Sequence, residues 1–308
     1  MKFLGYILLL FILIYPSVGN SQDVFDVTTI KEIPSTEVEA LVSFYKSLNG
    51  DSWNQKRNWL QTNTPSGWYG VTVIAGHVAE LNMTSNNLNG SIPKEIGKLP
   101  FLKQIDFFNN SISGTLPEEI CFLELLTKLN LANNSISGNL PQNIGNLRQL
   151  NEMILSNNKF EGSIPASIVS LNKIKGLSLS HNQLTGTIPE DIDQMKELTF
   201  FSVAMNKISG SIPTSIGQLK KLKWLNLSEN NISGKIPEEI GGLQELTRLN
   251  CSKNKIEGSI PSAITSLDKL TYLNFSDNNL SGNLPKGLYA MKKLRGVLLS
   301  NNKLALTQ

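Results

Sequence analysis

The stretch LKWLNLSENNISGKIPEEIGGLQE, residues 222–245, states the unit from which most of this 308-residue chain is built. Its most regular position is the asparagine at 230, which recurs at a fixed step of 24 residues. The glycine at 234 and the proline at 237 recur with the same step. The recurring asparagines are Asn86, Asn110, Asn134, Asn158, Asn182, Asn206, Asn230, Asn254, Asn278 and Asn302. Internal repetition at a fixed period predicts a stacked repeat array.

Each unit predicts a strand, a turn and an extended return path. Leu225 and Leu227 alternate with polar residues, as in a short strand with one buried face. Asn230 follows the strand, where its amide can bond backbone groups of its own coil and of the neighbouring coil. Each of these groups, if left unpaired, would cost about 1–3 kcal/mol. Gly234 permits a tight turn, and Pro237 favours an extended segment. A single unit cannot bury its apolar stripe, so the coils must stack into a solenoid with a parallel sheet along one face.

The unit resembles the leucine-rich repeats of the 24-residue plant-type subfamily, with the pattern LxxLxLxxNxLxGxIPxxIGxL over about residues 78–304. This resemblance implies an α/β solenoid, a right-handed horseshoe with a parallel β-sheet on its concave face. Short 3-10 or extended segments would form the convex face, and a helical cap would cover the N-terminal end. The family also implies function through binding, usually of proteins, peptides or glycans.

The first 22 residues predict a signal peptide. Lys2 is a positive start, residues 3–15 are an apolar run, and Ser17-Val18-Gly19 supplies a small-residue cleavage site after Pro16. The run is shorter than the about 20 residues that a spanning helix needs. We therefore expect a secreted or cell-surface protein without a membrane span after cleavage, with an uncleaved anchor as the alternative.

Residues 23–77 are expected to form the N-terminal cap, and residues 78–308 an array of about ten repeats. Thr36 and Glu39 have the spacing of a helix capping box, and Asn49-Gly50 is typical of a helix end. Trp53, Trp59 and Trp68 follow in a tryptophan-rich segment. This region resembles the N-terminal cap of the same family.

The two cysteines depart from the plant pattern. Plant relatives usually carry paired cysteines in the cap and after the last repeat, whereas this chain has only Cys121 and Cys251, inside the array. They lie more than five repeats apart, so they cannot pair and we expect two packed thiols. The absence of paired cysteines in the cap and after the last repeat predicts a non-plant source. The array ends at VLLSNNKLALTQ without a polar capping repeat. This ending predicts either a continuation of the chain or pairing of the uncapped repeat with another molecule.

One column of side chains on the concave face predicts a ligand site. The position six before each repeated asparagine faces solvent, and four consecutive repeats place Phe200, Trp224, Arg248 and Tyr272 there. We call these four residues the aromatic–arginine row; Lys223 and Lys253 flank it. Neighbouring strands lie about 4.8 Å apart, so Arg248 should reach a cation–π contact with Trp224 and Tyr272. The alternative is packing across strands, worth about 0.2–1 kcal/mol per pair.

The neighbouring column, four residues before each asparagine, is mostly small and polar. Ile154 and Leu298 interrupt it. We interpret this column as a solvated sheet surface.

Composition argues against several other classes of function. A net charge of +3 without a basic run gives no indication of nucleic-acid binding. Two histidines and two cysteines are too few for a metal cluster, and no cofactor motif or catalytic spacing is present. We therefore predict a non-catalytic recognition module for an extracellular protein, peptide or glycan. The alternatives are an enzyme inhibitor similar to the polygalacturonase-inhibiting proteins and a structural, adhesive or ice-binding array.

Overall fold

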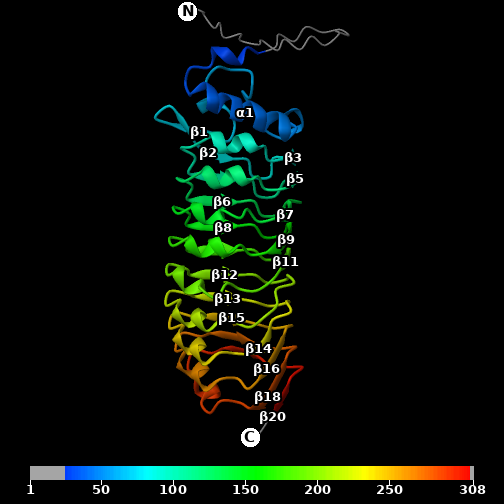
Figure 1. Ribbon diagram of the computed structural model, residues 1–308, viewed down its shortest axis with the longest axis vertical. Helices are drawn as coiled ribbons and strands as arrows, with labels where there is room; N and C mark the ends of the chain where they lie inside the picture. The colour runs from blue at the N-terminus through cyan, green and yellow to red at the C-terminus, as the bar shows by residue number, and fades with distance from the viewer. Residues whose placement is uncertain (1–24, 306–308) are drawn as a thin grey trace, which may run out of the picture.

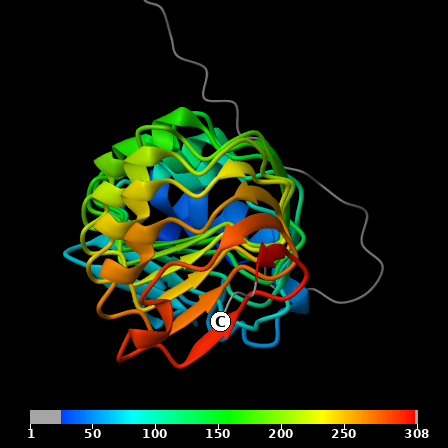
Figure 2. The same cartoon turned by 90° about the horizontal axis from the view of Figure 1, so that it is seen from below.

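The computed structural model describes residues 25–305, so the expected signal peptide at 1–22 lies outside the described residues. The chain forms a solenoid whose coils stack along the long axis (Figure 1). Helix α1, Ser35–Ser47, covers the N-terminal end of the stack, and the last strand, β20, lies at the other end. Viewed along the stack, the coils superpose around a common interior (Figure 2).

One face of the solenoid is a sheet of 11 strands. From β2 onward every neighbour is parallel, and each pairing joins residues 24 apart, as Trp224 pairs with Phe200 on one side and Arg248 on the other. In spatial order the strands are β1 (Val71–Ile74), β2 (His77–Asn82), β4 (Gln104–Asp106), β6 (Lys128–Asn130), β8 (Glu152–Ile154), β10 (Gly176–Ser178), β12 (Phe200–Ser202), β13 (Trp224–Asn226), β15 (Arg248–Asn250), β17 (Tyr272–Asn274) and β19 (Gly296–Leu298). This sheet is the concave face predicted from the sequence.

β1 was not predicted. It comes from the cap and pairs antiparallel with β2, with Ile74 opposite His77 at the turn. The cap thus continues the sheet as well as covering the core, because β1 occupies the hydrogen-bonding edge that the first repeat would otherwise leave open.

Short strands follow the turn of most repeats and form three smaller sheets. They are β3 (Asn89–Ser91), β5 (Ser111–Ser113), β7 (Ser137–Asn139), β9 (Lys159–Ser163), β11 (Gln183–Thr185), β14 (Ser233–Lys235), β16 (Lys255–Gly258), β18 (Asn279–Asn283) and β20 (Lys303–Ala305). Gly234 in β14 has a φ of 74°, the left-handed conformation for which the repeat keeps a glycine.

The return path of each repeat contains a 3-10 turn, which in most repeats directly follows the proline that recurs every 24 residues. In the array these turns are η4 (Lys94–Lys98), η5 (Glu118–Phe122), η6 (Ile144–Asn146), η7 (Ala166–Ser170), η8 (Ile192–Gln194), η9 (Thr214–Gln218), η10 (Glu238–Gly242), η11 (Ser262–Ser266) and η12 (Leu288–Ala290). The cap adds η1 (Val27–Thr29), η2 (Gly50–Ser52) and η3 (Pro65–Gly67). Between these turns and the concave sheet runs one continuous hydrophobic core.

The repeated asparagines join one coil to the next. Asn230 accepts a hydrogen bond from the Ile208 N–H at 2.9 Å and donates one to the Val203 carbonyl at 2.9 Å, both in the preceding coil. It also donates to two carbonyls of its own coil. Asn86, at the start of the array, instead bonds both backbone groups of Gln55 in the cap. Within residues 25–305 no buried side-chain nitrogen or oxygen lacks a partner, so the buried amides of the ladder are themselves hydrogen-bonded.

The cap helix begins differently from the prediction. α1 starts at Ser35 after Pro34, and no side chain caps it. The prediction of a capping box between Thr36 and Glu39 was therefore wrong. Proline before the first turn fixes the entry of the chain, and Thr36 already lies within the helix. The expected end is present: Asn49 has a φ of 55°, beyond the last helical turn.

The three cap tryptophans are almost fully buried, with exposures of 4% for Trp53, 1% for Trp59 and 2% for Trp68. Each indole N–H donates to a backbone carbonyl, as Trp59 Nε1 does to Tyr69 O at 2.8 Å. Their rings contact one another, with 4.9 Å between the Trp59 and Trp68 centroids. The cluster extends the core of the array into the cap.

Both cysteines are free and buried. Burial raises the pKa of Cys121 and of Cys251 to about 12. A thiol with so high a pKa is a poor nucleophile at neutral pH, so these side chains contribute packing to the core.

Candidate ligand-binding site on the concave sheet

The aromatic–arginine row occupies the first residue of four adjacent strands, β12, β13, β15 and β17. Trp224 is 37% exposed, in contrast to the cap tryptophans. The Phe200 ring meets it edge-on, with 4.9 Å between centroids and 89° between planes. On its other side the Arg248 guanidinium carbon lies 5.3 Å from the Trp224 ring centroid. Trp224 is therefore held between an aromatic edge and a cation while part of its surface stays open to solvent.

Tyr272 does not complete the predicted sandwich. Among residues 25–305, Arg248 makes its cation–π contact with Trp224 and none with Tyr272. The Tyr272 ring lies instead over the next strand, where a methyl group on Gly296 would come within 2.9 Å of Tyr272 Cδ2. The expectation of a second cation–π contact was wrong because the missing side chain of Gly296 offers the ring more room than the Arg248 side does.

The two flanking lysines differ in their surroundings. Lys223 is exposed immediately before β13. Lys253 lies in the turn after β15 and forms an ion pair with Glu229 at 3.2 Å. Surface pairs of this kind are worth about 0–1 kcal/mol, so Lys253 can exchange Glu229 for a ligand group at little cost.

A hollow of about 480 Å³ lies over the C-terminal half of the row. Trp224, Arg248, Tyr272 and Arg295 are among its lining residues, and Asn226 and Asn250 contribute amides. The arrangement brings aromatic faces, two guanidinium groups and uncharged amides together. Such a surface can stack planar groups and bind anionic ones.

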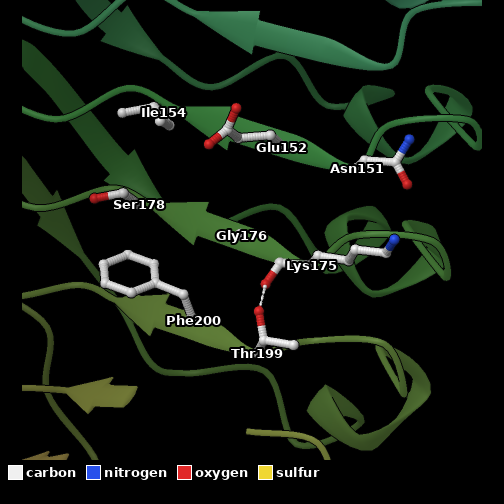
Figure 3. A pocket seen from close by; sticks show the side chains of 8 residues that line it. All are labelled: Asn151, Glu152, Ile154, Lys175, Gly176, Ser178, Thr199 and Phe200. Atoms are coloured by element: carbon white, nitrogen blue, oxygen red, sulfur yellow. Dashed lines mark hydrogen bonds between the residues drawn. The ribbon is translucent and has the colours of Figure 1, made fainter. Parts of the chain in front are cut away.

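A second hollow, of about 500 Å³, lies at the other end of the row (Figure 3). This hollow was not predicted from the sequence. It lies over Gly176, and we call it the Gly176 hollow. Its lining residues are Asn151, Glu152, Ile154, Lys175, Gly176, Ser178, Thr199 and Phe200. Two signals were available: the glycine in the column of the row, and Ile154 in a column of polar residues.

Next to the Gly176 hollow the sheet carries an ion pair. Lys128 Nζ lies 2.8 Å from Asp106 Oδ2. Burial raises the pKa of Asp106. Hydrogen bonds from Lys128, the Phe108 N–H and Asn130 lower this pKa by more than burial raises it, so the net shift is downward. The hydrogen bond to Asp106 raises the pKa of Lys128. On this part of the concave face the side chains thus contact one another across strands through an ion pair, whereas in the row they do so through aromatic rings.

The two histidines of the chain line neither hollow of the concave sheet. Within residues 25–305, no three His, Cys, Asp or Glu side chains are grouped so that they could hold a metal ion. His77 bonds the buried Glu37 at 2.6 Å in the cap, and His181 lies in a turn with a φ of 55°. The same range contains no helix long and apolar enough to cross a membrane.

A stacked solenoid, one long parallel sheet and an asparagine ladder define a repeat protein that presents its sheet as a surface. Sequence profiles identify the family. The Leucine Rich Repeat profile matches residues 77–99, 101–123, 125–147, 149–171 and 173–195. The Leucine-rich repeat region profile matches residues 206–305. The chain therefore belongs to the leucine-rich-repeat proteins, and its repeats are of the plant type.

Similar proteins include receptors of plants. The leucine-rich repeat receptor protein kinase EMS1 of Arabidopsis thaliana is 37% identical over 71 residues, 23% of this chain and 6% of that protein. The ectodomain of the Arabidopsis thaliana receptor kinase GASSHO1/SCHENGEN3, in complex with CASPARIAN STRIP INTEGRITY FACTOR 2, superposes with a TM-score of 0.73 at 30% identity. That match covers 82% of this chain and 34% of the ectodomain.

A third relative is the plant peptide hormone receptor RGFR1, in complex with RGF2. It has a TM-score of 0.68 and 35% identity, over 73% of this chain and 40% of RGFR1. In each case the chain spans well under half the length of the relative.

Proposed function

We propose that this protein is a non-catalytic recognition module that binds an extracellular peptide or protein on its concave sheet. The aromatic–arginine row carries the proposal: Trp224 is partly exposed on strand β13 of the concave sheet and is held by Phe200 and Arg248. Lys223 and Lys253 would contact the ligand at the edges. The GASSHO1/SCHENGEN3 and RGFR1 complexes support this reading, since both relatives were solved with a partner bound.

The composition of the row suits binding. Trp, Tyr and Arg are the residues that most often dominate interface energies, at about 2 kcal/mol or more each. Trp224 and Arg248 are already ordered by their mutual contact, so less side-chain entropy is lost when a ligand docks.

Secretion or cell-surface display is the setting in which such a module would meet its ligand. The signal-peptide pattern at 1–22 supports this location. The cap lacks the paired cysteines expected of plant relatives, which is our reason for proposing a non-plant source.

The first test is a binding screen against secreted proteins, peptides and glycans. We expect Trp224→Ala to weaken binding of the selected ligand by about 30-fold or more, the equivalent of about 2 kcal/mol. Phe122→Ala is the matched control, because Phe122 is a 62%-exposed aromatic on the η5 turn, away from the sheet.

Titration calorimetry on the three proteins, with melting curves alongside, would give the affinities and the stabilities. Equal affinities for wild type and Trp224→Ala would refute the proposed site. Loss of a partner enzyme's activity on mixing would favour the inhibitor alternative, and adsorption to ice or bulk polysaccharide would favour the structural array.

A further inference from the structure

The Gly176 hollow is created by one missing side chain. Gly176 begins β10, with Glu152 paired to it on one side and Phe200 on the other. These two neighbours are two strand spacings apart, about 10 Å, which leaves a slot one side chain wide. A methyl group on Gly176 would approach Glu152 Cγ at 3.8 Å and nothing else within 4 Å. The slot is therefore open above the glycine.

The walls of the slot are apolar on two sides. Figure 3 shows the Phe200 ring on one flank and Ile154 on the opposite flank, with Ser178 between them. The Ser178 hydroxyl is already bonded to the Ser156 hydroxyl at 2.6 Å, so it does not require a ligand. Ile154 interrupts a column of mostly polar residues at this place, which gives the slot an aliphatic surface where most other repeats have an amide or hydroxyl.

The rim of the slot carries an uncompensated carboxylate. Glu152 is half-buried, and its carboxylate takes part in none of the side-chain hydrogen bonds or ion pairs found among residues 25–305. Lys128 lies on the adjacent strand, and the negative charge of Glu152 contributes to raising the pKa of Lys128. The Lys128 ammonium, however, is bonded to Asp106. These three groups together have a net charge of −1. Figure 3 shows the Glu152 carboxylate extending toward Ile154, whereas Lys175 extends the opposite way.

We propose that the Gly176 hollow is a subsite for one basic side chain, arginine or lysine, of the ligand. The aliphatic stem would pack between Phe200 and Ile154, and the cationic head would bind the Glu152 carboxylate. This inference rests on the proposed function and deepens it, because it fixes how the ligand runs. Its basic residue lies at the Gly176 end of the aromatic–arginine row, and its anionic or planar groups lie at the Arg248 end.

The subsite can be tested with small probes, without the natural ligand. The probes are Nα-acetyl-arginine amide, its uncharged isostere Nα-acetyl-citrulline amide, and Nα-acetyl-norleucine amide. The readout is the methyl NMR signal of Ile154 in isoleucine-labelled protein, assigned by its loss in Ile154→Val. We expect the arginine probe to shift this signal saturably in the millimolar range, and the citrulline probe to bind about fivefold more weakly.

Three variants locate the effect. Glu152→Gln should reduce binding of the arginine probe to the level of the citrulline probe. Gly176→Leu should abolish the shift by filling the slot. If the leucine variant does not fold, Gly176→Ala replaces it: the added methyl group makes one ordinary contact, and the shift should be weaker than in the wild type.

Four results would overturn the proposal: no saturable shift, equal binding of the arginine and citrulline probes, binding of norleucine as tight as that of arginine, or a shift that survives Gly176→Leu. Failure of the subsite can be told apart from failure of the proposed function, because the probe experiment does not use the natural ligand. Probe binding combined with a Trp224→Ala variant of full ligand affinity would retain the subsite and reject the row.

Discussion

The cap and the concave sheet use the same residue, tryptophan, in opposite ways. Trp59 is 1% exposed, donates its indole N–H to Tyr69 and contacts aromatic rings on several sides. Trp224 is 37% exposed and is contacted by one ring edge and one guanidinium. Burial with a satisfied donor indicates a role in stability, whereas partial exposure with ordering neighbours indicates a surface prepared for contact. The comparison separates structural from functional aromatics within one chain.

The largest expected difference is in stability. Trp59→Ala should lower the free energy of unfolding by about 3–5 kcal/mol, because it removes a buried ring from the centre of the cap cluster. Trp224→Ala should cost about 1 kcal/mol or less, because the ring packs on the solvent-facing side of the sheet and its removal leaves no cavity in the core. Denaturant unfolding of both variants would measure the two values. Similar losses would show that Trp224 is also a core residue and would remove the contrast.

A smaller effect separates buried from exposed asparagines. Asn158→Ala should cost about 1–3 kcal/mol, because it removes the acceptor of the buried Ile136 N–H and the donor to Leu131 O. Asn82→Ala is the control, since Asn82 is exposed in the polar column of the sheet. Thermal melts should show a clear loss for the first variant and almost none for the second. A large loss in Asn82→Ala would mean that the polar column is structural.

The sequence predicted the asparagine ladder, the register of the strands and the direction of the aromatic–arginine row, because a strict 24-residue period allows only one way of stacking the coils. It did not predict side-chain directions within the row. Tyr272 turns toward Gly296 and the Gly176 hollow opens beside Phe200, and both depend on a glycine in the neighbouring strand. The start of α1 at Ser35 and the antiparallel strand β1 were missed because the cap is not periodic. Local patterns there compete with tertiary contacts.

The smallest expected effect concerns the charged part of the concave face. The pKa of Asp106 is lowered in the folded protein, so its contribution to stability is present above the ordinary carboxyl pKa and is lost as pH falls through the folded value. The pKa of Lys128 is raised, so its contribution is lost only at alkaline pH, as pH rises through the folded value. The melting-temperature difference between wild type and Asp106→Asn should therefore be present at neutral pH and shrink in acid. A difference that stays constant in acid would exclude the ion pair as its cause.

The most direct test of the central claim is hydroxyl-radical footprinting of the four tryptophans, with and without the ligand selected in the binding screen. Mass spectrometry would report the oxidation rate of each side chain. The account predicts that Trp224 is oxidised in the free protein and protected in the complex, while Trp53, Trp59 and Trp68 are slow in both states. A ligand that binds and leaves Trp224 as reactive as before would contradict the assignment of the concave row as the binding site.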